Sequence, residues 1–386
     1  MTKRHSYNGT MSNIPEVCIH GAGVVGHALA IALARAGRRV AVVSQAQPHA
    51  HDVRAYAINA ASQRLIESLG AWPDASAVTA VQHMQVWGDD GGSILFHAEG
   101  SDPLNAIVDV PALEAALQQQ AHATAGIDWL TQAVSAKLHI VCEGRHSTTR
   151  AQLGVQRLRR PYGQVALATR MRTEHTHCAQ ASQWFRSGGP EGASILALLP
   201  MGGAQGHEVA VVWSLPASQV HSLLHCPDTD FESAITQASR GLLGQLTLTA
   251  ARSSWPLEWG QADHWCGRDA QGQAWVLAGD AARNIHPLAG LGLNLGLADV
   301  RALLDHLPTL HGDHHWRPLD DLRLLRAYER QRKAESAPTS WVVDGLQGLF
   351  MHPNPSAQKL RNWGLNAVNQ WPGLKHWIVQ RALSPL

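Results

Sequence analysis

The fold is decided by the stretch from Ala274 to Leu307, AWVLAGDAARNIHPLAGLGLNLGLADVRALLDHL. It begins with a short apolar run, Ala274–Gly279, typical of a strand that is buried on both faces. A Gly-Asp pair ends this run, and a turn through Arg283–Leu288 follows it. From about Leu291 the apolar residues recur at helical spacing. The stretch therefore predicts a buried strand, a polar residue at its carboxyl end, a glycine-rich turn and a helix.

This predicted corner has the properties of a ligand site. The carboxyl ends of parallel strands are where α/β proteins place their ligands, and the amino end of a helix offers free N–H groups and a partial positive charge. Asp280 can accept hydrogen bonds from a polyol. We expect Gly290, Gly292 and Gly296 to let a flat ligand lie against the backbone, because they carry no side chain.

A second ligand-binding pattern lies near the start of the chain, where GAGVVG fits the GxGxxG fingerprint. We expect Gly21 to permit a tight turn, Gly23 to let a pyrophosphate approach and Gly26 to let the helix pack on the strand. The pattern predicts a dinucleotide site but does not choose FAD over NAD. The flanking elements that we expect are a strand over Glu16–His20, a helix over His27–Ala36 and a strand over Arg39–Val43.

The string GDAARNIHPLAGLGLNLGLADV, from Gly279 to Val300, resembles the second flavin-contact motif of FAD-dependent aromatic hydroxylases with the para-hydroxybenzoate hydroxylase fold. Among them it resembles most the hydroxylases of ubiquinone biosynthesis, and the resemblance runs from about Pro15 to the end of the chain. It implies an α/β fold: a Rossmann-like FAD-binding domain, an inserted antiparallel β-sheet substrate domain and a C-terminal helical segment. The implied domains are 14–160 with 274–306, then 161–273, then 307–386.

The same resemblance implies the activity and the site. FAD would be the cofactor, with NAD(P)H and O2 as co-substrates, and the reaction would hydroxylate the aromatic ring of a polyprenylated phenol or another hydrophobic aromatic. The frame DxRAxAxxxxSxxLxxxLGxW around Arg54 also matches the family, in which an arginine lies near the flavin. The cofactor-binding residues that we predict are Gly21, Gly23, Val25, Gly26, Arg54, Gly279, Asp280, Pro287, Gly290, Gly292, Leu293 and Asn294.

Catalytic side chains are not evident, because in such enzymes the flavin carries the difficult chemistry. His286 is a weak candidate for an acid or base, and a structural turn histidine is an equal alternative. The histidine pairs lie in polar, loop-like stretches without cysteine or carboxylate partners at ligand spacing, so we expect no metal. These pairs are His49/His51, His175/His177 and His314/His315.

Four departures from the family pattern leave alternatives open. Ser44 stands where an acidic residue usually holds the ribose, Glu143 replaces an aspartate, and Leu291 replaces a glutamine. The segment from Gly126 to Glu143 lacks room for the hairpin that normally precedes the next strand. One alternative is therefore a weak or inactive paralogue that acts as a binding subunit of the ubiquinone-synthesis assembly. Another is an aromatic hydroxylase for a soluble phenol.

The middle of the chain reads as an antiparallel sheet, because several segments alternate apolar with polar residues. Candidates for the lining of a substrate pocket are Trp184, Phe185, Leu199 and Trp213. The strands expected here are Tyr162–Arg172, Ser182–Arg186, Ala193–Met201, His207–Leu215 and Gln245–Ser253, with a helix over Phe231–Leu243. Two earlier strands are expected over Val81–Trp87 and Ser93–His97.

The tail from Leu322 to Leu386 is helical by pattern. We expect a solvated face at Leu324–Ala334 and amphipathic, Trp-rich segments at Trp341–Met351 and Trp363–Val379. The Trp-rich segments suit either a membrane interface or packing against the flavin domain.

Composition limits the remaining possibilities. A net charge of +1 over 386 residues offers no electrostatic case for nucleic acid. The five cysteines are widely spaced and odd in number, which favours reduced cytoplasmic thiols. We therefore expect a cytoplasmic location. The Trp-rich tail adds an expectation of peripheral contact at the inner face of the membrane, and the resemblance implies other ubiquinone-synthesis proteins as partners.

Overall fold

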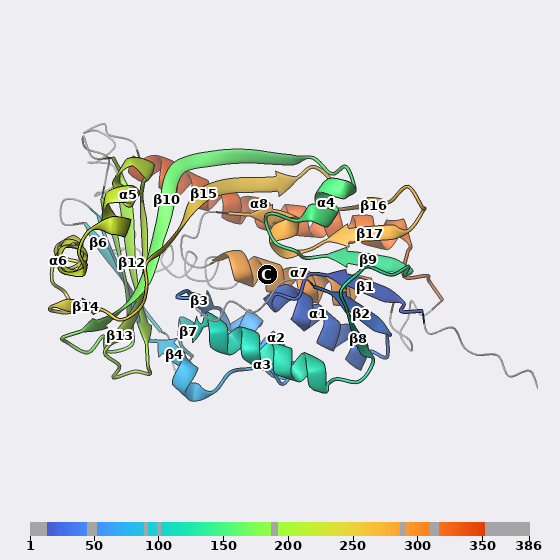
Figure 1. The fold of residues 1–386 in the computed structure, drawn as a ribbon, viewed down its shortest axis with the longest axis horizontal. Coiled ribbons are helices and arrows are strands. Elements are labelled where there is room, and N and C mark those ends of the chain that lie inside the picture. The colour runs from blue at the N-terminus through green and yellow to red at the C-terminus, as the bar shows by residue number, and fades with distance from the viewer. Residues whose placement is uncertain are drawn as a thin grey trace, which may run out of the picture.

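The computed structural model describes residues 14–44, 52–88, 92–98, 102–186, 192–285, 291–308 and 316–351, with side chains up to residue 338. In this part of the chain the strands form three sheets, and helices pack around two of them (Figure 1). The fold class expected from the sequence, α/β with an inserted antiparallel sheet and a helical C-terminal segment, is confirmed.

The first sheet has six strands in the order β16-β17-β9-β1-β2-β8. All neighbouring pairs are parallel except β16 with β17. The central strands are apolar and buried on both faces, as parallel strands between two layers must be. The strands are β1 (Val17–His20), β2 (Val40–Val43), β8 (Ile127–Leu130), β9 (Leu138–Val141), β16 (Cys266–Arg268) and β17 (Ala274–Leu277).

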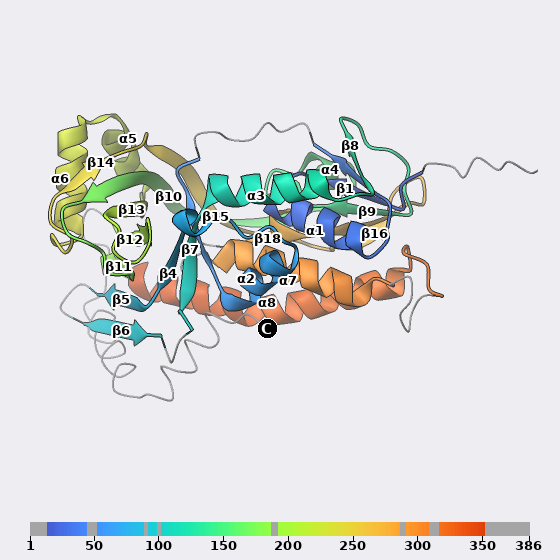
Figure 2. The ribbon, with the colours of Figure 1, turned by 90° about the horizontal axis from the view of Figure 1, so that it is seen from below.

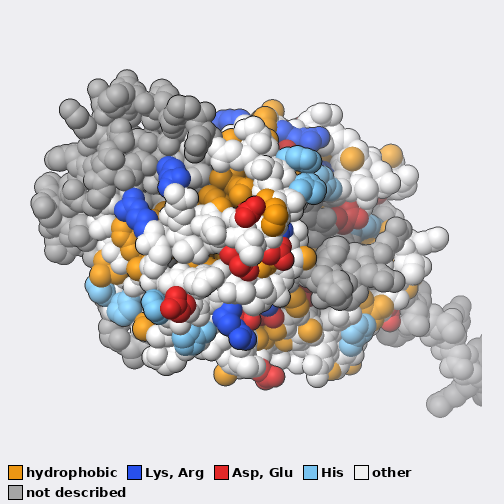
Figure 3. Space-filling model, turned by 60° about the vertical axis from the view of Figure 1, so that its left-hand side comes forward, with side chains coloured by type: hydrophobic (Ala, Val, Ile, Leu, Met, Phe, Trp, Pro, Cys, Tyr) orange, Lys and Arg blue, Asp and Glu red, His pale blue; other side chains and the backbone are white. Residues whose placement is uncertain are grey.

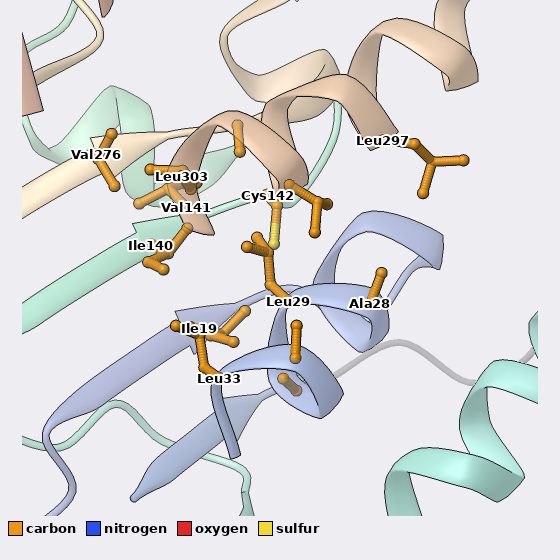
Figure 4. Close-up of a cluster of buried hydrophobic side chains, with 14 of the residues drawn as sticks. Ile19, Ala28, Leu29, Leu33, Ile140, Val141, Cys142, Val276, Leu297 and Leu303 are labelled. Carbon is orange, nitrogen blue, oxygen red and sulfur yellow. The ribbon is translucent and has the colours of Figure 1, made fainter. Parts of the chain in front are cut away.

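Helices α1 and α7 close one face of this sheet. Ile19 of β1 and Ile140 of β9 pack against Leu29 and Leu33 of α1 and against Leu303 of α7 (Figure 4). Seen from below, α3 runs beside α1 and α8 runs beside α7 (Figure 2). These helices are α1 (Val24–Arg35), α3 (Val110–Ala123), α7 (Leu291–His306) and α8 (Leu322–Met351).

The second sheet has nine strands in the order β18-β15-β10-β13-β12-β11-β5-β6, with β14 paired to β10. Strand β10 is 17 residues long, and together with β15 it reaches across to the first sheet (Figure 1). The strands are β5 (His83–Trp87), β6 (Ser93–His97), β10 (Arg157–Thr173), β11 (Gln180–Arg186), β12 (Ser194–Met201), β13 (Glu208–Pro216), β14 (Leu246–Leu248), β15 (Ser253–Ala262) and β18 (Arg283–Asn284). Helices α5 (Ala217–His225) and α6 (Asp228–Ala238) cover its outer face.

A small third sheet lies between the other two in the order β3-β7-β4. Its residues Ala57 and Ile107 pack against Leu199 and Ala210 of the second sheet. The elements are β3 (Ala55–Ile58), β4 (Val78–Val81) and β7 (Asn105–Asp109), and α2 (Ala60–Ser68) follows β3 in sequence. The short helix α4 (Thr148–Gln152) follows β9 of the first sheet. Short 3₁₀ turns occur at Ala75–Ala77 and Gly279–Ala281.

Three boundaries expected from the sequence are wrong. The strand expected over Val81–Trp87 is two strands in different sheets, because β4 ends at Val81 and β5 begins at His83. The helix expected over Phe231–Leu243 ends at Ala238, since Arg240 adopts a positive φ of 56°. Only Leu246–Leu248 of the expected strand Gln245–Ser253 pairs, while Ser253 begins the long strand β15.

The solvated face expected at Leu324–Ala334 covers only part of that stretch, in which Arg326, Arg330 and Gln331 are exposed. Leu325 and Tyr328 are fully buried, and Arg332 is only 1% exposed. Tyr328 donates a hydrogen bond from its hydroxyl to the carbonyl oxygen of Leu277 at 3.1 Å. Helix α8 thus packs the face that carries Leu325, Tyr328 and Arg332 into the protein, and Arg332 is buried there because it meets a buried acid that is described below.

The shortened connection predicted between β8 and β9 is present in the structure. Residues 131–137 form a coil without a hairpin and connect the two strands directly. The Trp-rich segment Trp363–Val379 lies outside the described residues, and only the backbone of Trp341–Met351 is described. Among the described helices, none combines the length and the apolar content needed to cross a bilayer.

Charged side chains of both signs are interspersed on the face shown in Figure 3, and no continuous basic surface forms there. This distribution agrees with the formal net charge of +1. The view therefore gives no support to nucleic-acid binding at this face.

A buried histidine predicts how stability depends on pH. Burial, together with nearby His122, lowers the pKa of His27 to about 4. The hydrogen bond that His27 Nδ1 donates to the carbonyl of Gly23 acts in the opposite direction and raises the pKa. The unfolded chain therefore binds more protons than the folded chain between about pH 6.5 and 4, so stability falls as pH drops through this window. From about pH 7.5 to about pH 5, this one group lowers the free energy of unfolding by about 2 kcal/mol.

We predict that His27→Leu makes the loss of stability on acidification smaller by about that amount. Urea unfolding of both proteins at the two pH values measures the difference. His83→Gln, at an exposed histidine pair, serves as the control and should leave the pH dependence unchanged. An equal loss in His27→Leu and the unaltered protein would contradict the assignment.

Candidate functional site

Val25, near the start of α1, joins the two ligand-binding stretches that the sequence predicts. A Cβ on Gly279 would lie 3.3 Å from Val25 Cγ2, and a Cβ on Gly296 would lie 2.8 Å from the same atom. The side chain of Val25 therefore sits in a notch formed by two glycines that are distant from it in sequence. The expectation that Gly296 leaves room for a flat ligand is wrong, because the space belongs to Val25.

The three glycines of the first turn occupy three different environments. Gly21 has a φ of +109°, and a Cβ there would lie 2.7 Å from the carbonyl oxygen of Cys142. A Cβ on Gly26 would lie 2.0 Å from the carbonyl oxygen of Gly21, so α1 packs directly on the turn. Gly23 is exposed, and nothing lies within 4 Å of its missing Cβ. The open side of this turn, at the amino end of α1, could receive a pyrophosphate.

Asp280 lies at the end of β17, in the short turn Gly279–Ala281, between two buried neighbours. Its side chain is exposed to solvent, yet the surrounding protein is close enough that burial raises its pKa. Positive charge on Arg283, Arg145 and Arg54 acts in the opposite direction. The carboxylate of Asp280 is thus open to solvent on one side and surrounded by protein on the others, as expected of a residue that lines a ligand site.

Arg54 and Tyr56 belong to the same surroundings as Asp280. Arg54 Nε donates to both carboxylate oxygens of Asp52 at 2.9 Å, and its guanidinium lies 5.6 Å from the centre of the Tyr56 ring. Burial raises the pKa of Tyr56 to about 12, while Arg54 lowers it and Asp280 raises it. The structure therefore brings Arg54 and Asp280, which are far apart in the sequence, within electrostatic range of one another.

A buried ion network, which the sequence analysis missed, supports this corner. Asp299 is fully buried and accepts hydrogen bonds from Gly279 N at 2.9 Å, Arg283 Nη1 at 3.0 Å and Arg332 Nε at 2.7 Å. A buried carboxylate is tolerated only when it is paired in this way. The turn before Asp280 is thus tied to both α7 and α8. An aspartate among the apolar residues of α7 was the signal that could have revealed it.

The amino end of α7 holds three of the predicted residues. Gly292 has nothing within 4 Å of its missing Cβ, and Leu293 is half-buried. Asn294 is buried, and its amide accepts from Asn59 N at 3.0 Å and donates to Ala57 O at 2.7 Å. The side chain of Asn294 ties α7 to the start of α2. Because its amide is used in these bonds, Asn294 would contact a ligand through its backbone. The predicted residues His286, Pro287 and Gly290 lie outside the described part of the chain.

Glu143, the departure noted in the sequence, has a defined structural role. Its carboxylate accepts hydrogen bonds from Ser147 Oγ at 2.6 Å, Thr149 Oγ1 at 2.8 Å and Thr149 N at 3.0 Å. Burial alone would raise the pKa of Glu143, but these bonds outweigh burial and lower it. From the α4 helix that Glu143 caps, Arg150 donates to Ala281 O at 2.8 Å. Glu143 therefore binds the amino end of α4, and Arg150 joins that helix to the Asp280 corner.

The four residues proposed as substrate lining lie on opposite faces of the second sheet. Trp184 and Trp213 pack under α5 and α6, and Trp184 stacks on Trp87 with ring centres 4.7 Å apart. These two tryptophans are core. Phe185 and Leu199 point to the inner face, where Phe185 packs with Ile285 and with residues at the start of α7.

The inner face of this sheet has small side chains in its middle. Cross-strand pairing aligns Gln183, Ala197, Val212 and Ala168 in one row across four strands. Ala197 and Val212 remain half-exposed. The next row aligns Phe185, Ile195, Ser214 and Ala166, of which the first two form an apolar wall with Ile285 and Leu291. This face could accept a hydrophobic ring beside the amino end of α7.

Comparison with known families identifies the ligand that fits this arrangement. The family described as FAD binding domain matches residues 15–131 and 113–337 of the chain. FAD has a pyrophosphate between two ends, and the described residues offer an exposed glycine turn in contact, through Val25, with the strand end that carries the exposed Asp280. The residues present therefore fit FAD.

Curated relatives match over nearly the whole chain. The ubiquinone hydroxylase UbiL of Rhodospirillum rubrum is 28% identical over 410 residues, which cover 98% of this chain and 91% of the relative. The 3-demethoxyubiquinol 3-hydroxylase of Escherichia coli is 29% identical over 405 residues, which cover 97% of this chain and all of the relative.

Solved structures share the fold at lower sequence identity. The probable FAD-dependent monooxygenase PqsL of Pseudomonas aeruginosa superposes with a TM-score of 0.71 at 21% identity, covering 92% of this chain and 99% of that one. The flavin-dependent brominase Bmp2 superposes with a TM-score of 0.74 at 13% identity, covering 96% and 93%.

The notch around Val25 can be tested by substitution in the FAD-free protein. Helix propensity alone predicts that Gly296→Ala stabilises by up to about 1 kcal/mol. Because the new Cβ would meet Val25 at 2.8 Å, we predict instead a loss of about 1–3 kcal/mol in urea unfolding. Gly292→Ala in the same helix, with nothing near its Cβ, is the matched control.

Adding Val25→Ala to Gly296→Ala should recover part of this loss, so the double variant should be less destabilised than the sum of the two single variants. A coupling energy of about 1 kcal/mol or more is expected. Strict additivity of the two substitutions would show that the contact does not exist.

A separate prediction concerns the open phosphate turn. Gly23 has φ −82° and ψ −173°, which alanine also adopts, but Gly23 is the N-cap of α1, where glycine is preferred over alanine, so Gly23→Ala should lower the stability of the FAD-free protein by only about 1 kcal/mol. The added methyl would occupy the surface that we assign to the pyrophosphate. We expect FAD affinity, measured by fluorescence titration, to fall at least about ten-fold, which is about 1.4 kcal/mol. An unchanged affinity would remove Gly23 from the site.

Proposed function

Because this chain belongs to the FAD-binding-domain family, we propose that it is an FAD-dependent monooxygenase that hydroxylates the aromatic ring of a polyprenylated phenol in ubiquinone biosynthesis. NAD(P)H and O2 are the co-substrates. The observation that carries the proposal is the junction of the phosphate turn and the Asp280 corner through Val25. The names of the relatives from Rhodospirillum rubrum and Escherichia coli support the ubiquinone pathway.

In this proposal separate elements of the chain bind different parts of the cofactor. Gly21, Gly23 and Gly26 form the pyrophosphate turn at the amino end of α1, and Asp280 accepts hydrogen bonds from the sugar-alcohol chain. Gly292 and the backbone of Leu293 and Asn294 face the ring from the amino end of α7. Gly279 and Val25 keep these parts in contact, and Pro287 and Gly290 complete the predicted set.

When bound, FAD supplies electron transfer from NAD(P)H and activation of O2. The chain supplies position and electrostatics. The partial positive charge at the amino end of α7 and the guanidinium of Arg54 stabilise negative charge near them. The apolar wall of Phe185, Ile195 and Ile285 excludes water from the neighbouring substrate face. His286 remains a candidate for moving a proton there.

The small, half-exposed side chains of Ala197 and Val212 favour a hydrophobic aromatic substrate. A prenyl chain gains roughly 0.8 kcal/mol for each CH₂ that it buries, so an apolar face selects it over a small soluble phenol. Residues 14–160 and 274–306 would bind FAD, and 161–273 would bind substrate, although β5, β6 and β18 join the substrate-side sheet from outside that range. Peripheral membrane contact and partner proteins of the pathway would involve the Trp-rich tail within 307–386.

The second candidate function is a weak or inactive paralogue that serves as a binding subunit. It rests on Ser44, Glu143, Leu291 and the missing hairpin. The capping bonds of Glu143 and the packing of Leu291 against the apolar wall give two of these departures a place in an ordered site. FAD content and substrate-dependent turnover distinguish the two functions.

We predict that the purified protein is yellow, holds one FAD per chain and oxidises NADPH faster when a prenylated phenol is present. Absorbance of released FAD and the rate of NADPH loss measure both, with the unprenylated phenol as the matched substrate. A colourless protein that takes up no added FAD would favour the binding subunit. Equal stimulation by both phenols would favour the soluble-phenol hydroxylase.

Val212→Phe should fill the substrate face without touching the FAD-binding turns. We expect FAD content to stay the same while kcat/KM for the prenylated phenol falls at least about ten-fold, as expected when a pocket is obstructed. An unchanged kcat/KM would mean that the substrate binds elsewhere.

A further inference from the structure

A cysteine and two histidines meet on the first sheet, away from the residues assigned to FAD. Cys18 and His20 alternate along β1 and so point to the same face, opposite to Val17 and Ile19, which face α1. His139 of β9 is the direct neighbour of Cys18 in the strand register. One nitrogen or sulfur atom from each of the three side chains lies within 4.8 Å of those of the other two.

The two imidazole rings are held in a definite orientation. His20 Nε2 faces His139 Nδ1 at 2.9 Å, so these inner nitrogens point toward each other. The outer nitrogens have oxygen partners: His139 Nε2 lies 2.7 Å from Gln273 Oε1, and His20 Nδ1 lies 3.4 Å from Thr149 Oγ1. Histidines that bind a metal commonly donate their other N–H to an oxygen in this way.

These outer partners are themselves fixed. Thr149 Oγ1 donates to Glu143 Oε1 at 2.8 Å, and Gln273 Nε2 donates to Ser135 Oγ at 2.7 Å. Both oxygens are therefore oriented to accept a proton from the rings. If each ring carries its proton on the outer nitrogen, both inner nitrogens keep a lone pair that is free to bind a metal.

We propose that Cys18, His20 and His139 bind a Zn²⁺ ion. One thiolate and two neutral imidazoles are ligands that zinc takes in tetrahedral sites, and a fourth position remains for water. The inner nitrogens and the sulfur need to move by less than about 1 Å to reach zinc–ligand distances of about 2.0–2.1 Å for nitrogen and 2.3 Å for sulfur. The oxygen donors that Ca²⁺ and Mg²⁺ require are not among the three ligands.

The protons balance with a single release. Burial lowers the pKa of His20 to about 4 and also lowers that of His139, so both rings are neutral near pH 7. Zinc takes the place of the proton between the two inner nitrogens, and that proton moves to the outer nitrogen of His20, facing Thr149. Burial raises the pKa of the Cys18 thiol, so the thiol gives up its proton to solvent only as zinc binds, because only the thiolate is a ligand.

The ion can reach this site from the surface. His139 is half-buried, and the contact between Gln273 and Ser135 beyond it is exposed. Ser135 belongs to the coil 131–137, which stands where the resemblance leads us to expect a hairpin. A zinc ion would join β1 to β9 beneath this thin cover, just before β1 enters the phosphate turn at Gly21.

The sequence alone does not reveal this cluster, because its ligands are not at the short spacing that marks a metal site in a sequence. His20 and His139 are 119 residues apart and meet only through parallel strand pairing. The proposal does not depend on the proposed monooxygenase activity, since the three ligands lie outside the FAD and substrate residues.

The test is metal analysis of the purified protein, without added FAD, after incubation with Zn²⁺ and dialysis. We expect one zinc per chain, and X-ray absorption should show one sulfur at about 2.3 Å with nitrogens at about 2.0–2.1 Å. Cys18→Ser and His139→Gln should each lower zinc affinity at least about 100-fold, and Gln273→Leu, at the surface, about 10–100-fold.

His97→Gln is the matched control, because His97 Nδ1 faces His83 Nδ1 at 3.0 Å in an exposed pair that is not part of the cluster. It should leave zinc content unchanged. A protein that retains no zinc, or an absorption spectrum without a sulfur ligand, would overturn the proposal even if the cluster variants fail to fold. Zinc that binds equally tightly to the Cys18→Ser, His139→Gln double variant would do the same.

Discussion

The contact of Val25 with Gly279 and Gly296 is the constraint on which the rest of the site depends. It holds the amino end of α1, the end of β17 and the helix α7 together at one point. Any side chain at either glycine would push these three elements apart. The phosphate turn and the Asp280 corner can therefore serve one cofactor only because two positions on the opposing elements have no side chain.

Buried polar groups then fix the orientation of that junction. Asp299 accepts the backbone N–H of Gly279 and pairs with Arg283 and Arg332, while Glu335 supplies a second negative charge to Arg332, so α7 and α8 both support the turn. Arg150 adds a bond from α4 to Ala281 on the other side. Such buried charges are costly unless fully paired, which makes this geometry more selective than apolar packing alone would be.

Glycine positions and apolar periodicity in the sequence predicted most helices and strands. Contacts between residues far apart in the sequence determined what these local patterns could not predict. The strand and helix on either side of Gly21–Gly26 and of Asp280 follow from glycine positions and apolar period, and the structure forms them; of the turn expected after Asp280, Arg283–Asn284 instead pairs with β15 and residues 286–288 lie outside the described part of the chain. The contacts of Gly296, Asn294 and Arg332 could not be predicted locally, because each depends on a residue far away in sequence: Val25, Asn59 and Asp299. The Cys18–His20–His139 cluster was missed for the same reason.

The central claim is that the two stretches hold opposite parts of a single FAD. A crystal structure of the protein grown with FAD tests this most directly. The account predicts one FAD per chain, with its pyrophosphate over Gly23, its sugar-alcohol chain at Asp280 and its ring beside the amino end of α7. FAD bound elsewhere, or side chains filling the space between Gly23 and Asp280, would contradict it.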